Sequence, residues 1–398
     1  MNLKIFTDNI EEKAKEQVLT LASHPAFSDC RIRIMPDVHA GAGCVIGFTA
    51  DLGNKVIPQV VGVDIGCGML TCVLGDVPIN FEQLDEIIYN HIPHGLCIHN
   101  HPTIGVDFLR KLRCLDYLKN RDRIRASLGT LGGGNHFIEI DQNKDGDKYL
   151  IIHTGSRNLG KQVADYYQNI AIDKLLHNKD RYREAMDAMI ADLKERGLQS
   201  EISNRIKELR QQFDSEPAIP RDLCYLTDQD REDYLHDMAL CQWFATQNRQ
   251  RIAFEILCHL CLPCHDYFET IHNYIDLKSN IVRKGAIAAY ANQRLLIPMN
   301  MRDGCILGIG KGNPDWNCSA PHGAGRIMSR MKARETISMD AYRDTMREAN
   351  IFTSSVNEST IDESPMAYKP VDEIVRLIEP TVEIVDILKP IYNFKAAE

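Results

Sequence analysis

The sequence predicts a single domain that mixes helices with short strands. Apolar, strand-like runs separated by glycines fill residues 31–74 and return after residue 266. A charged, mainly helical stretch of about residues 160–258 lies between them. Residues suited to one functional site occur on both sides of that stretch. We therefore interpret it as a helical insertion within one domain over residues 1–398.

The individual elements follow from apolar spacing, caps and breakers. The first predicted helix is capped by Asp8 or Asn9, and a helical hairpin in the insertion is expected to break near Gly197. The predicted helices cover residues 10–23, 81–91, 229–258, 338–348 and 370–379. The predicted strands cover residues 31–35, 44–50, 56–65, 69–74 and 148–153, followed by an apolar, strand-like tail at the end of the chain.

Composition indicates an ordinary globular protein, because 44% of the 398 residues are hydrophobic and 25% are charged. The N-terminal residues lack a signal-peptide pattern, and no apolar run is long enough to span a bilayer, so the expected location is the cytoplasm, away from membranes. Thirteen cysteines, an odd number, suit a reducing compartment. The formal charge of −9 does not favour nucleic-acid binding, although a local basic groove is compatible with it.

The first motif with chemical potential is VGVDIGCGM, residues 61–69. Asp64 and Cys67 stand among glycines, which permit a tight turn that aims both side chains at one point. A carboxylate and a thiolate are good ligands for a divalent transition metal. Taken alone, the fragment favours an ordinary turn with a buried cysteine.

The second motif is GTLGGGNHFIEI, residues 129–140. Its glycines can turn backbone N–H groups toward an anion, Asn135 can donate to a phosphate oxygen, and His136 follows directly. Glu139 interrupts an apolar strand, where a carboxylate needs a partner. The N1–H and N2 amine of a guanine base are suitable donors. The alternative is a flexible glycine turn with a capped histidine.

The third motif, HTGSRNLGKQ, occupies residues 153–162. Gly155, Gly160 and Lys161 match the frame of a phosphate-binding loop, but Gln162 replaces the hydroxyl residue that binds magnesium in such loops. We therefore prefer His153 as a metal ligand at a strand end. In this interpretation three residues that follow contact an anion: Ser156, Arg157 and Asn158.

The fourth motif, ETIHNYID, places His272 and Asn273 in a strand-like segment at residues 269–276. A single histidine in a strand is more often structural, so this signal is weak alone. A preceding cluster resembles a zinc or iron–sulfur knuckle, but no second ligand pair follows it, and an apolar helical face explains its first two cysteines better. The cluster consists of Cys258, Cys261, Cys264 and His265.

The fifth motif, residues 308–330, is the most specific. His322 lies in a glycine-rich turn immediately before an apparent helix start, and Arg326 and Arg330 follow. A helix N-terminus and an arginine both favour a phosphate beside His322. Because a neutral histidine against a phosphate is a competent nucleophile, we prefer this role to a capping role.

Together the motifs resemble the RtcB family of RNA-splicing ligases. The resemblance covers about residue 31 to the C-terminus and implies an α+β fold in one domain, with mixed β-sheets, surrounding helices and the helical insertion. The matching segments occur in the family's order: MPDVHAG (35–41), VGVDIGCGM, GTLGGGNHFIEI, HTGSR, IHN, RKGA (283–286), HGAGR, YKPVDEIV and LKP.

The resemblance also implies roles for individual residues. His322 resembles the histidine that takes GMP from GTP, Glu139 the residue that reads guanine, and Tyr368 an aromatic residue that stacks on the base. The expected ligands of a two-metal centre are Asp64, a bridging Cys67, His136, His153 and His272. Further nucleotide or phosphate contacts are expected from Asn135, Arg157, Asn273, Arg326 and the near-terminal Lys395.

The implied activity is a GTP- and Mn²⁺-dependent RNA ligase that acts in RNA repair or tRNA splicing. It would join 3′-phosphate or 2′,3′-cyclic phosphate ends to 5′-hydroxyl ends through a histidine–GMP intermediate, with two Mn²⁺ ions per chain. The ligand set also suits Zn²⁺ or Co²⁺. Expected partners are such RNA ends, GTP and, as an option, an accessory protein. The alternatives are a dinuclear-metal phosphoesterase that acts on RNA ends without nucleotidyl transfer, and a phosphate-loop NTPase.

Three departures from the family pattern suggest a divergent branch, which we interpret as one with a repair substrate. Val282 stands where the family usually has histidine, residues 298–303 read PMNMRD in place of Pro-Gly-Ser-Met-Gly, and Lys395 precedes Ala-Ala-Glu instead of glycine. RNA binding is expected to weaken steeply with salt. The predicted basic groove comprises Arg157, Arg283, Lys284, Arg326, Arg330, Lys332 and Arg334.

Overall fold

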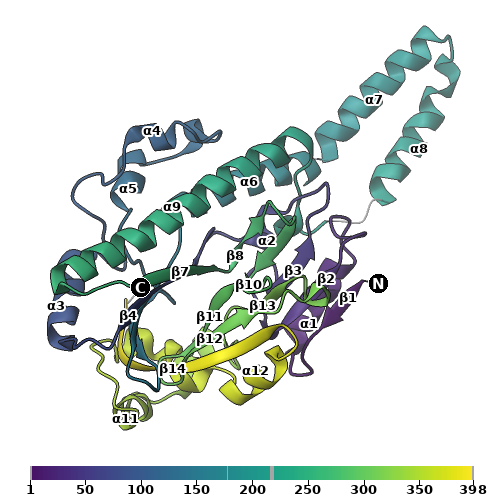
Figure 1. Cartoon of the computed structure of the whole chain (residues 1–398). Helices are drawn as coiled ribbons and strands as arrows, with labels where there is room; N and C mark the ends of the chain where they lie inside the picture. The colour runs from purple at the N-terminus through teal and green to yellow at the C-terminus, as the bar shows by residue number, and fades with distance from the viewer. Residues whose placement is uncertain (1, 177, 216–218, 397–398) are drawn as a thin grey trace.

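A computed structural model describes residues 2–176, 178–215 and 219–396 of the chain. Its helices and three β-sheets are interspersed along the sequence (Figure 1), which confirms the α+β class. Two sheets of seven and five strands form the body, and a two-stranded sheet accompanies them.

The largest sheet has the strand order β11-β12-β14-β5-β6-β4-β7, and every neighbouring pair is antiparallel. The strands predicted over residues 69–74 and 148–153 are confirmed as β4 and β6, and the predicted tail is β14. The seven strands are β4 (Gly68–Gly75), β5 (Phe137–Gln142), β6 (Lys148–Thr154), β7 (Asp266–Ile271), β11 (Arg294–Asn300), β12 (Gly304–Gly310) and β14 (Val382–Lys395).

The second sheet has the order β1-β2-β3-β9-β8, and only its β1–β2 pair is parallel among the described strands. The strands predicted near residues 31–35 and 44–50 are confirmed here as β2 and β3. The five strands are β1 (Leu3–Ile5), β2 (Ile32–His39), β3 (Ile46–Asp51), β8 (Asn273–Asp276) and β9 (Ile281–Lys284). The short third sheet pairs β10 (Ala286–Ala288) with β13 (Ser319–Pro321).

The predicted helices over residues 81–91, 229–258, 338–348 and 370–379 are confirmed as α3, α9, α11 and α12. In the insertion, α7 and α8 form a hairpin that extends away from the body (Figure 1) and breaks at Gly197, as expected. The helices are α1 (Glu12–Ala22), α2 (Pro58–Val61), α3 (Phe81–His91), α4 (Val106–Leu109), α5 (Arg121–Ala126), α6 (Arg157–Leu176), α7 (Asn178–Glu195), α8 (Ile202–Ser215), α9 (Asp228–Leu260), α10 (Arg330–Thr336), α11 (Met339–Glu348) and α12 (Val371–Ile378). Short 3₁₀ turns are η1 (Leu115–Tyr117), η2 (Gln199–Glu201), η3 (Arg221–Leu223), η4 (Pro314–Trp316), η5 (Glu358–Glu363) and η6 (Pro365–Ala367).

Helix α9 joins the two main apolar cores. Its Met238 belongs to the core that includes Ile34 of the five-stranded sheet, and its Ile252 belongs to the core that includes Ile152 of the seven-stranded sheet. Each fully buried side chain of this size contributes about 1.5–3 kcal/mol. The helix therefore fixes the two sheets against each other. In the part of the chain that the structure describes, no helix combines the length and apolar character needed to cross a membrane.

Two local predictions are wrong. Residues 56–65, predicted as a strand, contain the short helix α2, because Pro58 occupies its first position and Gly62 ends it. Helix α1 is preceded by Glu11 and has no side-chain cap. Asn9, one of the predicted caps, instead donates from Nδ2 to the carboxylate of Glu373, at 3.1 Å from Oε2.

Candidate active site

Four strand ends of the seven-stranded sheet meet at one edge. Strand β4 begins directly after Cys67, β5 begins directly after His136, β6 ends one residue beyond His153, and β7 ends directly before His272. Because neighbouring strands are antiparallel, the register pairs Gly68 with both Thr154 and Ile271 and brings these ends together. Sheet pairing therefore positions residues that are widely separated in the sequence.

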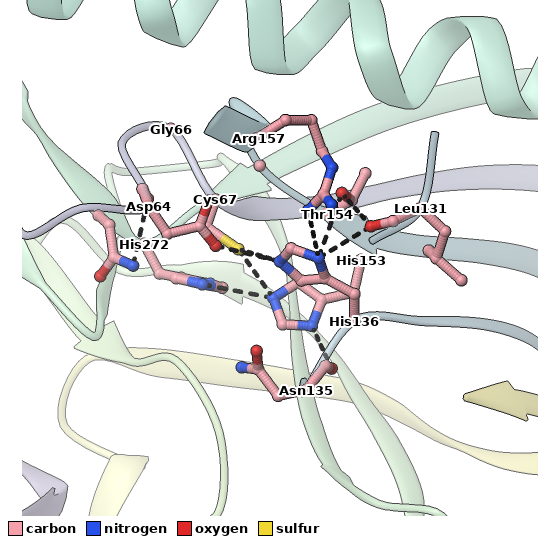
Figure 2. Close-up of polar contacts among 12 residues, drawn as sticks. Asp64, Gly66, Cys67, Leu131, Asn135, His136, His153, Thr154, Arg157 and His272 are labelled. Carbon is pink, nitrogen blue, oxygen red and sulfur yellow. Dashed lines mark hydrogen bonds and ion pairs between the residues drawn. The ribbon is translucent and has the colours of Figure 1, made fainter. Parts of the chain in front are cut away.

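The five sequence-predicted metal ligands converge at this edge (Figure 2). Cys67 Sγ lies 3.3 Å from His153 Nε2 and 3.5 Å from His136 Nε2. His136 Nε2 is 3.0 Å from Asp64 Oδ2, and His153 Nε2 is 3.4 Å from His272 Nε2. The donors form two groups, Asp64–Cys67–His136 and Cys67–His153–His272. Cys67 belongs to both groups, as expected for a ligand that bridges two ions.

The protonation of the histidines fits cation binding. His136 Nδ1 lies 2.9 Å from the carbonyl of Leu131, and His153 Nδ1 lies 3.1 Å from the carbonyl of Asn135, so each Nδ1 carries the proton. Burial lowers the pKa of His153 and of His272 well below the ordinary value, and neighbouring positive groups add to this effect. His153 and His272 are therefore neutral, and their Nε2 atoms face each other at 3.4 Å, an arrangement that a divalent cation satisfies.

Asp64 and Cys67 differ in charge. Burial opposes ionisation of Asp64, but the hydrogen bond and charge of His136 hold its pKa well below the ordinary value. Burial and the adjacent Asp64 raise the pKa of the Cys67 thiol well above its ordinary value. A cation would reverse this preference and favour the thiolate. Gly155 is required here, because a Cβ at that position would come within 2.1 Å of Asp64 Oδ1.

His322 lies beside the ligand cluster, and its ring centroid is 5.0 Å from that of His272. Its Nδ1 is 2.6 Å from Oδ2 of Asp37, which is fully buried in β2. The carboxylate accepts a hydrogen bond from Nδ1–H, which leaves the Nε2 lone pair free to attack. The expected helix start after His322 is wrong, because α10 begins only at Arg330 behind the Ser329 cap.

A cavity of about 620 Å³ opens in front of His322, and His153 and His272 also line it. Five of the sequence-predicted nucleotide-contact residues line the same cavity: Asn135, Glu139, Arg326, Tyr368 and Lys395. Arg157 and Asn273 lie elsewhere. Arg157 Nη1 is 3.3 Å from His136 Nδ1, and Asn273 Nδ2 is 3.5 Å from the carbonyl of Asp64.

A second cavity of about 320 Å³ reaches the ligand cluster from another direction. Asp64 and His136 line it together with three basic side chains, Arg123, Arg157 and Lys161. The cluster therefore separates two cavities, one that holds the His322 imidazole and one that is rich in positive charge.

Glu139, which lines the large cavity, forms a buried carboxyl pair with Asp141. Glu139 and Asp141 project from the same face of β5 and are buried, and Asn393 Nδ2 donates to Glu139. Cys305 Sγ lies 3.7 Å from Glu139 Oε1. Both oxygens of Asp141 have no hydrogen-bond partner among the described residues. Burial raises the pKa of Glu139 well above its ordinary value, and the charge of Asp141 adds to this effect.

Sequence reasoning missed two carboxylates of the site. Asp37 lies inside the MPDVHAG segment, and the close approach of Gly325, whose Cβ would meet the Asp37 carbonyl at 2.4 Å, is a signal in the HGAGR segment. Glu363 ion-pairs with Lys395 at 2.6 Å and with Arg330 at 2.7 Å, although it stands in a turn without a recognisable motif, η5.

Several predicted groove residues are structural. Arg283 is fully buried and donates to Ser319 Oγ at 2.9 Å, because β9 is an inner strand. Lys284 Nζ lies 3.2 Å from the carbonyl of Gln59. Arg330 and Arg334 both pair with Asp362. The predicted groove over all seven residues is therefore wrong. Lys332 is exposed on the first turn of α10, as are Arg330 and Arg334 on the same helix.

The cysteine cluster at residues 258–265 and the phosphate-loop frame at residues 155–161 both have ordinary surroundings. Among the described residues, the groups close enough to hold a metal do not include Cys258, Cys261 or Cys264. All three cysteines are exposed, so the apolar helical face expected for Cys258 and Cys261 is wrong. Lys161 extends from α6 and pairs with Asp165 at 2.7 Å, as in an ordinary helix. All thirteen cysteines are free, and eight are buried.

The departures in sequence fall at different depths. Val282 is buried in the core of β9, away from the large cavity. Four residues of the PMNMRD stretch line that cavity: Pro298, Met299, Asn300 and Met301. Arg302 pairs with its neighbour Asp303 at 2.8 Å. The third departure begins at Ala396, which is buried in the core that includes Ile152, and its remaining residues 397–398 lie outside the described residues.

A Cys–His–Asp cluster next to a His–Asp pair and a large cavity defines a candidate metal-dependent active site with a nucleophilic histidine. Comparisons with known proteins show the family to which a chain with this site belongs. The family model described as "tRNA-splicing ligase RtcB" matches residues 17–108 and 112–396. The chain belongs to the RtcB family.

Relatives of known name are similar over most of their length. "RNA-splicing ligase RtcB" of Escherichia coli (strain K12) is 28% identical over 394 residues, which cover 85% of this chain and 84% of the relative. "tRNA-splicing ligase RtcB" of Nanoarchaeum equitans is 27% identical over 450 residues, 89% of this chain and 86% of the relative. The protein of the same name from Aeropyrum pernix is 26% identical and covers 82% and 79%.

Proposed function

We propose that this chain is a GTP-dependent RNA ligase that joins RNA 3′-phosphate or 2′,3′-cyclic phosphate ends to 5′-hydroxyl ends. The observation that carries the proposal is the His322–Asp37 pair, which faces a nucleotide-sized cavity beside the metal-ligand cluster. A phosphoesterase that never forms a nucleotide adduct has no need of this pair. The names of the relatives supply the substrate class.

His322 acts as the nucleophile. Its Nε2 lone pair attacks the α-phosphorus of GTP, a P–N bond forms, and the P–O bond to pyrophosphate breaks with its electron pair on the leaving oxygen. The Nδ1 proton stays on the ring, and the hydrogen bond to Asp37 stabilises the positive charge that develops there. The buried Asp37 also fixes the ring orientation, because its Oδ2 accepts the backbone N–H of His322 at 3.1 Å.

Two further steps complete the ligation. An oxygen of the RNA 3′-phosphate attacks the phosphorus of the histidine adduct, which breaks the P–N bond and forms a phosphoanhydride. A cyclic phosphate must first be opened by water to give this 3′-phosphate. The 5′-hydroxyl oxygen then attacks the RNA phosphorus, loses its proton to solvent and displaces GMP. The basic second cavity, lined by Arg157 and Arg123, is where we expect an RNA end to approach.

The metal ligands in this proposal are Asp64, Cys67, His136, His153 and His272. They fit two divalent cations, since two donor groups share Cys67 and their histidine lone pairs converge. Divalent cations held by these residues would supply charge that neutralises phosphoryl oxygens in the reaction. The donor set suits Mn²⁺, and it also suits Zn²⁺ and Co²⁺.

The rest of the large cavity would hold the nucleotide. Glu139 can accept the N1–H and N2 amine of guanine, Lys395 can donate to an acceptor on the base, and the Tyr368 ring can stack on it. Asn135 and Arg326 would contact phosphate oxygens. We further propose that the divergent stretch at residues 298–301 adapts this cavity to the substrate of a repair reaction.

Intact-protein mass spectrometry tests the proposal. The protein is incubated with GTP and Mn²⁺, and we expect a covalent GMP adduct that is stable to base, labile to acid and missing from His322→Ala. End-labelled RNA with a 3′-phosphate should then give a longer product. Loss of the end phosphate without a longer product would support the phosphoesterase instead. No adduct with GTP and Mn²⁺ would overturn the proposed ligase mechanism.

A further inference from the structure

A buried carboxylate connects the residues of the nucleotide end of the large cavity. Glu363 ends η5, is 2% exposed and lines the cavity. Its Oε2 accepts hydrogen bonds from Lys395 Nζ at 2.6 Å and from the Tyr368 hydroxyl at 2.6 Å. Its Oε1 lies 2.7 Å from Arg330 Nη1 and 3.4 Å from Arg326 Nη1.

These contacts leave no lone pair of Glu363 for a ligand. A carboxylate has about four acceptor positions, and four donors from four different side chains occupy them. Burial alone would raise the pKa of Glu363, but the charges of Lys395 and two arginines lower it to about 2. Glu363 is therefore a buried anion at neutral pH, and its role is to bind and orient the neighbouring side chains.

Lys395 depends on this anion. It lies in β14 and is 8% exposed, and its Nζ donates to Glu363. A buried ammonium without a partner would be costly, and a long lysine side chain has many rotamers. Glu363 therefore selects the rotamer in which Nζ faces the cavity that Glu139 also lines. The β14–β5 register pairs Asn393 with Glu139 and Lys395 with Phe137, so the ammonium and the Glu139 carboxyl lie on the same face of the sheet.

The aromatic side of the cavity is held by the same group. The Tyr368 hydroxyl is bonded to Glu363, and the Arg326 guanidinium lies 5.1 Å from the centre of the Tyr368 ring. Burial and the negative charge of Glu363 raise the pKa of Tyr368 well above its ordinary value, so the hydroxyl remains a donor. The hydroxyl contact and the Arg326 guanidinium together fix the ring plane before a base enters.

We propose that Glu363 is a positioning residue that sets the base specificity of the cavity, by fixing Lys395 as a donor next to Glu139 as an acceptor. This inference rests on the proposed function. A donor next to an acceptor matches guanine, which presents the O6 acceptor beside the N1–H and N2 donors. Adenine presents a donor where guanine has O6, so a fixed ammonium there rejects it.

Glu363→Gln provides the main test. The amide keeps the size of the group but removes the charge that orients the ammonium of Lys395. In the GMP-adduct assay with Mn²⁺ we expect KM for GTP to rise by about tenfold or more, because charge-assisted hydrogen bonds are affected. The kcat should stay within about threefold, since His322 and Asp37 are unchanged. The preference for GTP over ATP should fall by about tenfold or more.

Asp362→Asn is the matched control. Asp362 is the preceding residue and is 1% exposed, but its carboxylate pairs with Arg330 and Arg334, not with Lys395 or Tyr368. A general loss of buried charge at η5 would affect both variants, whereas loss of nucleotide positioning affects only Glu363→Gln. Glu363→Asp, which keeps the charge on a shorter side chain, should restore part of the GTP preference.

Tyr368→Phe tests the proposal even if Glu363→Gln fails to fold. It keeps the ring that stacks on the base and removes the hydrogen bond to Glu363, so we expect a smaller rise in KM for GTP and little change in kcat. The proposal would be overturned if folded Glu363→Gln had the same KM for GTP and the same base preference as wild type. If Glu363→Gln does not fold, the same result in Tyr368→Phe would overturn it.

Calorimetric titration of GTP and of ATP into His322→Ala with Mn²⁺ separates this inference from the proposed function. His322→Ala cannot form the adduct, so binding is measured alone. If wild type forms no adduct but His322→Ala still prefers GTP, the ligase mechanism is refuted. The role of Glu363 is then tested in the His322→Ala/Glu363→Gln double variant, which should lose the preference for GTP. Equal affinity of His322→Ala for GTP and ATP would overturn the specificity proposal itself.

Discussion

Asp141→Asn is expected to stabilise the folded protein at neutral and alkaline pH. Asp141 is fully buried, neither of its carboxylate oxygens has a hydrogen-bond partner among the described residues, and Glu139 lies on the same face of β5. Oxygen atoms of the two carboxyl groups lie within 4.8 Å of each other, so the charge of ionised Asp141 opposes the ionisation of Glu139. An amide at position 141 removes one of the charges and supplies a donor for Glu139.

The size of the effect follows from the pKa of Asp141. Burial raises this pKa from 3.8 to about 6, and each pKa unit corresponds to about 1.4 kcal/mol, so ionisation of Asp141 costs roughly 3 kcal/mol of stability. The folded-state pKa is the higher one. Below pH 4 Asp141 is protonated, and the wild-type protein has the full stability that this form allows. As the pH rises through about 6 the group ionises, and this part of the free energy of unfolding is lost. The variant carries no such loss, so the difference should grow from near zero at low pH to the full value at pH 8.

Urea denaturation at pH 4.5 and pH 8, followed by circular dichroism, measures the difference. Asp145→Asn is the matched control, because Asp145 is an exposed aspartate in the neighbouring turn and its replacement should change neither curve. The reasoning is refuted if Asp141→Asn is no more stable than wild type at pH 8. It is equally refuted if the gain is the same at both pH values.

Three further predictions concern the candidate active site. Asp37→Asn should lower the rate of GMP-adduct formation, measured by quenched mass spectrometry, by about 100-fold or more, because the amide no longer stabilises the charged His322 ring. A rate within about threefold of wild type would contradict this prediction. Cys67→Ala should reduce bound Mn²⁺ after gel filtration, measured by elemental analysis, since two donor groups share its sulfur; unchanged metal content would rule out the bridge. Lys161→Ala should leave calorimetric GTP affinity within about twofold, because Lys161 pairs with Asp165 on a helix surface; loss of binding would revive the phosphate-loop hypothesis.

The sequence was most informative where a pattern is local. The apolar spacing at residues 81–91 predicts α3 because an amphipathic helix depends on its own periodicity and on the Asn80 cap. Residues 56–65 show the limit of this approach, since a short apolar run fits a strand or a buried turn equally well. Arg283 shows another limit. Its burial depends on β9 lying between β3 and β8, which no local pattern encodes.

The residues of the candidate site also fall into those that a local pattern predicts and those that it does not. The predicted ligands stand beside glycine turns at strand ends, so their residue types and neighbours suggest a metal before the sheet is known. Asp37 was missed because its partner His322 is 285 residues away, and an aspartate in a strand has no local mark of such a contact. Glu363 was missed for the same reason, since Lys395 reaches it from another element.

Strand β14 has a consequence for the order in which the molecule assembles. It lies between β12 and β5, although it is the last strand of the chain. Among the described strands, β11 and β12 pair with the rest of the seven-stranded sheet only through β14. Until β14 emerges from the ribosome this strand pairing is incomplete, and the cavity lacks Asn393 and Lys395. Synthesis of β14 therefore closes the sheet and supplies Asn393 and Lys395 to the cavity in a single event.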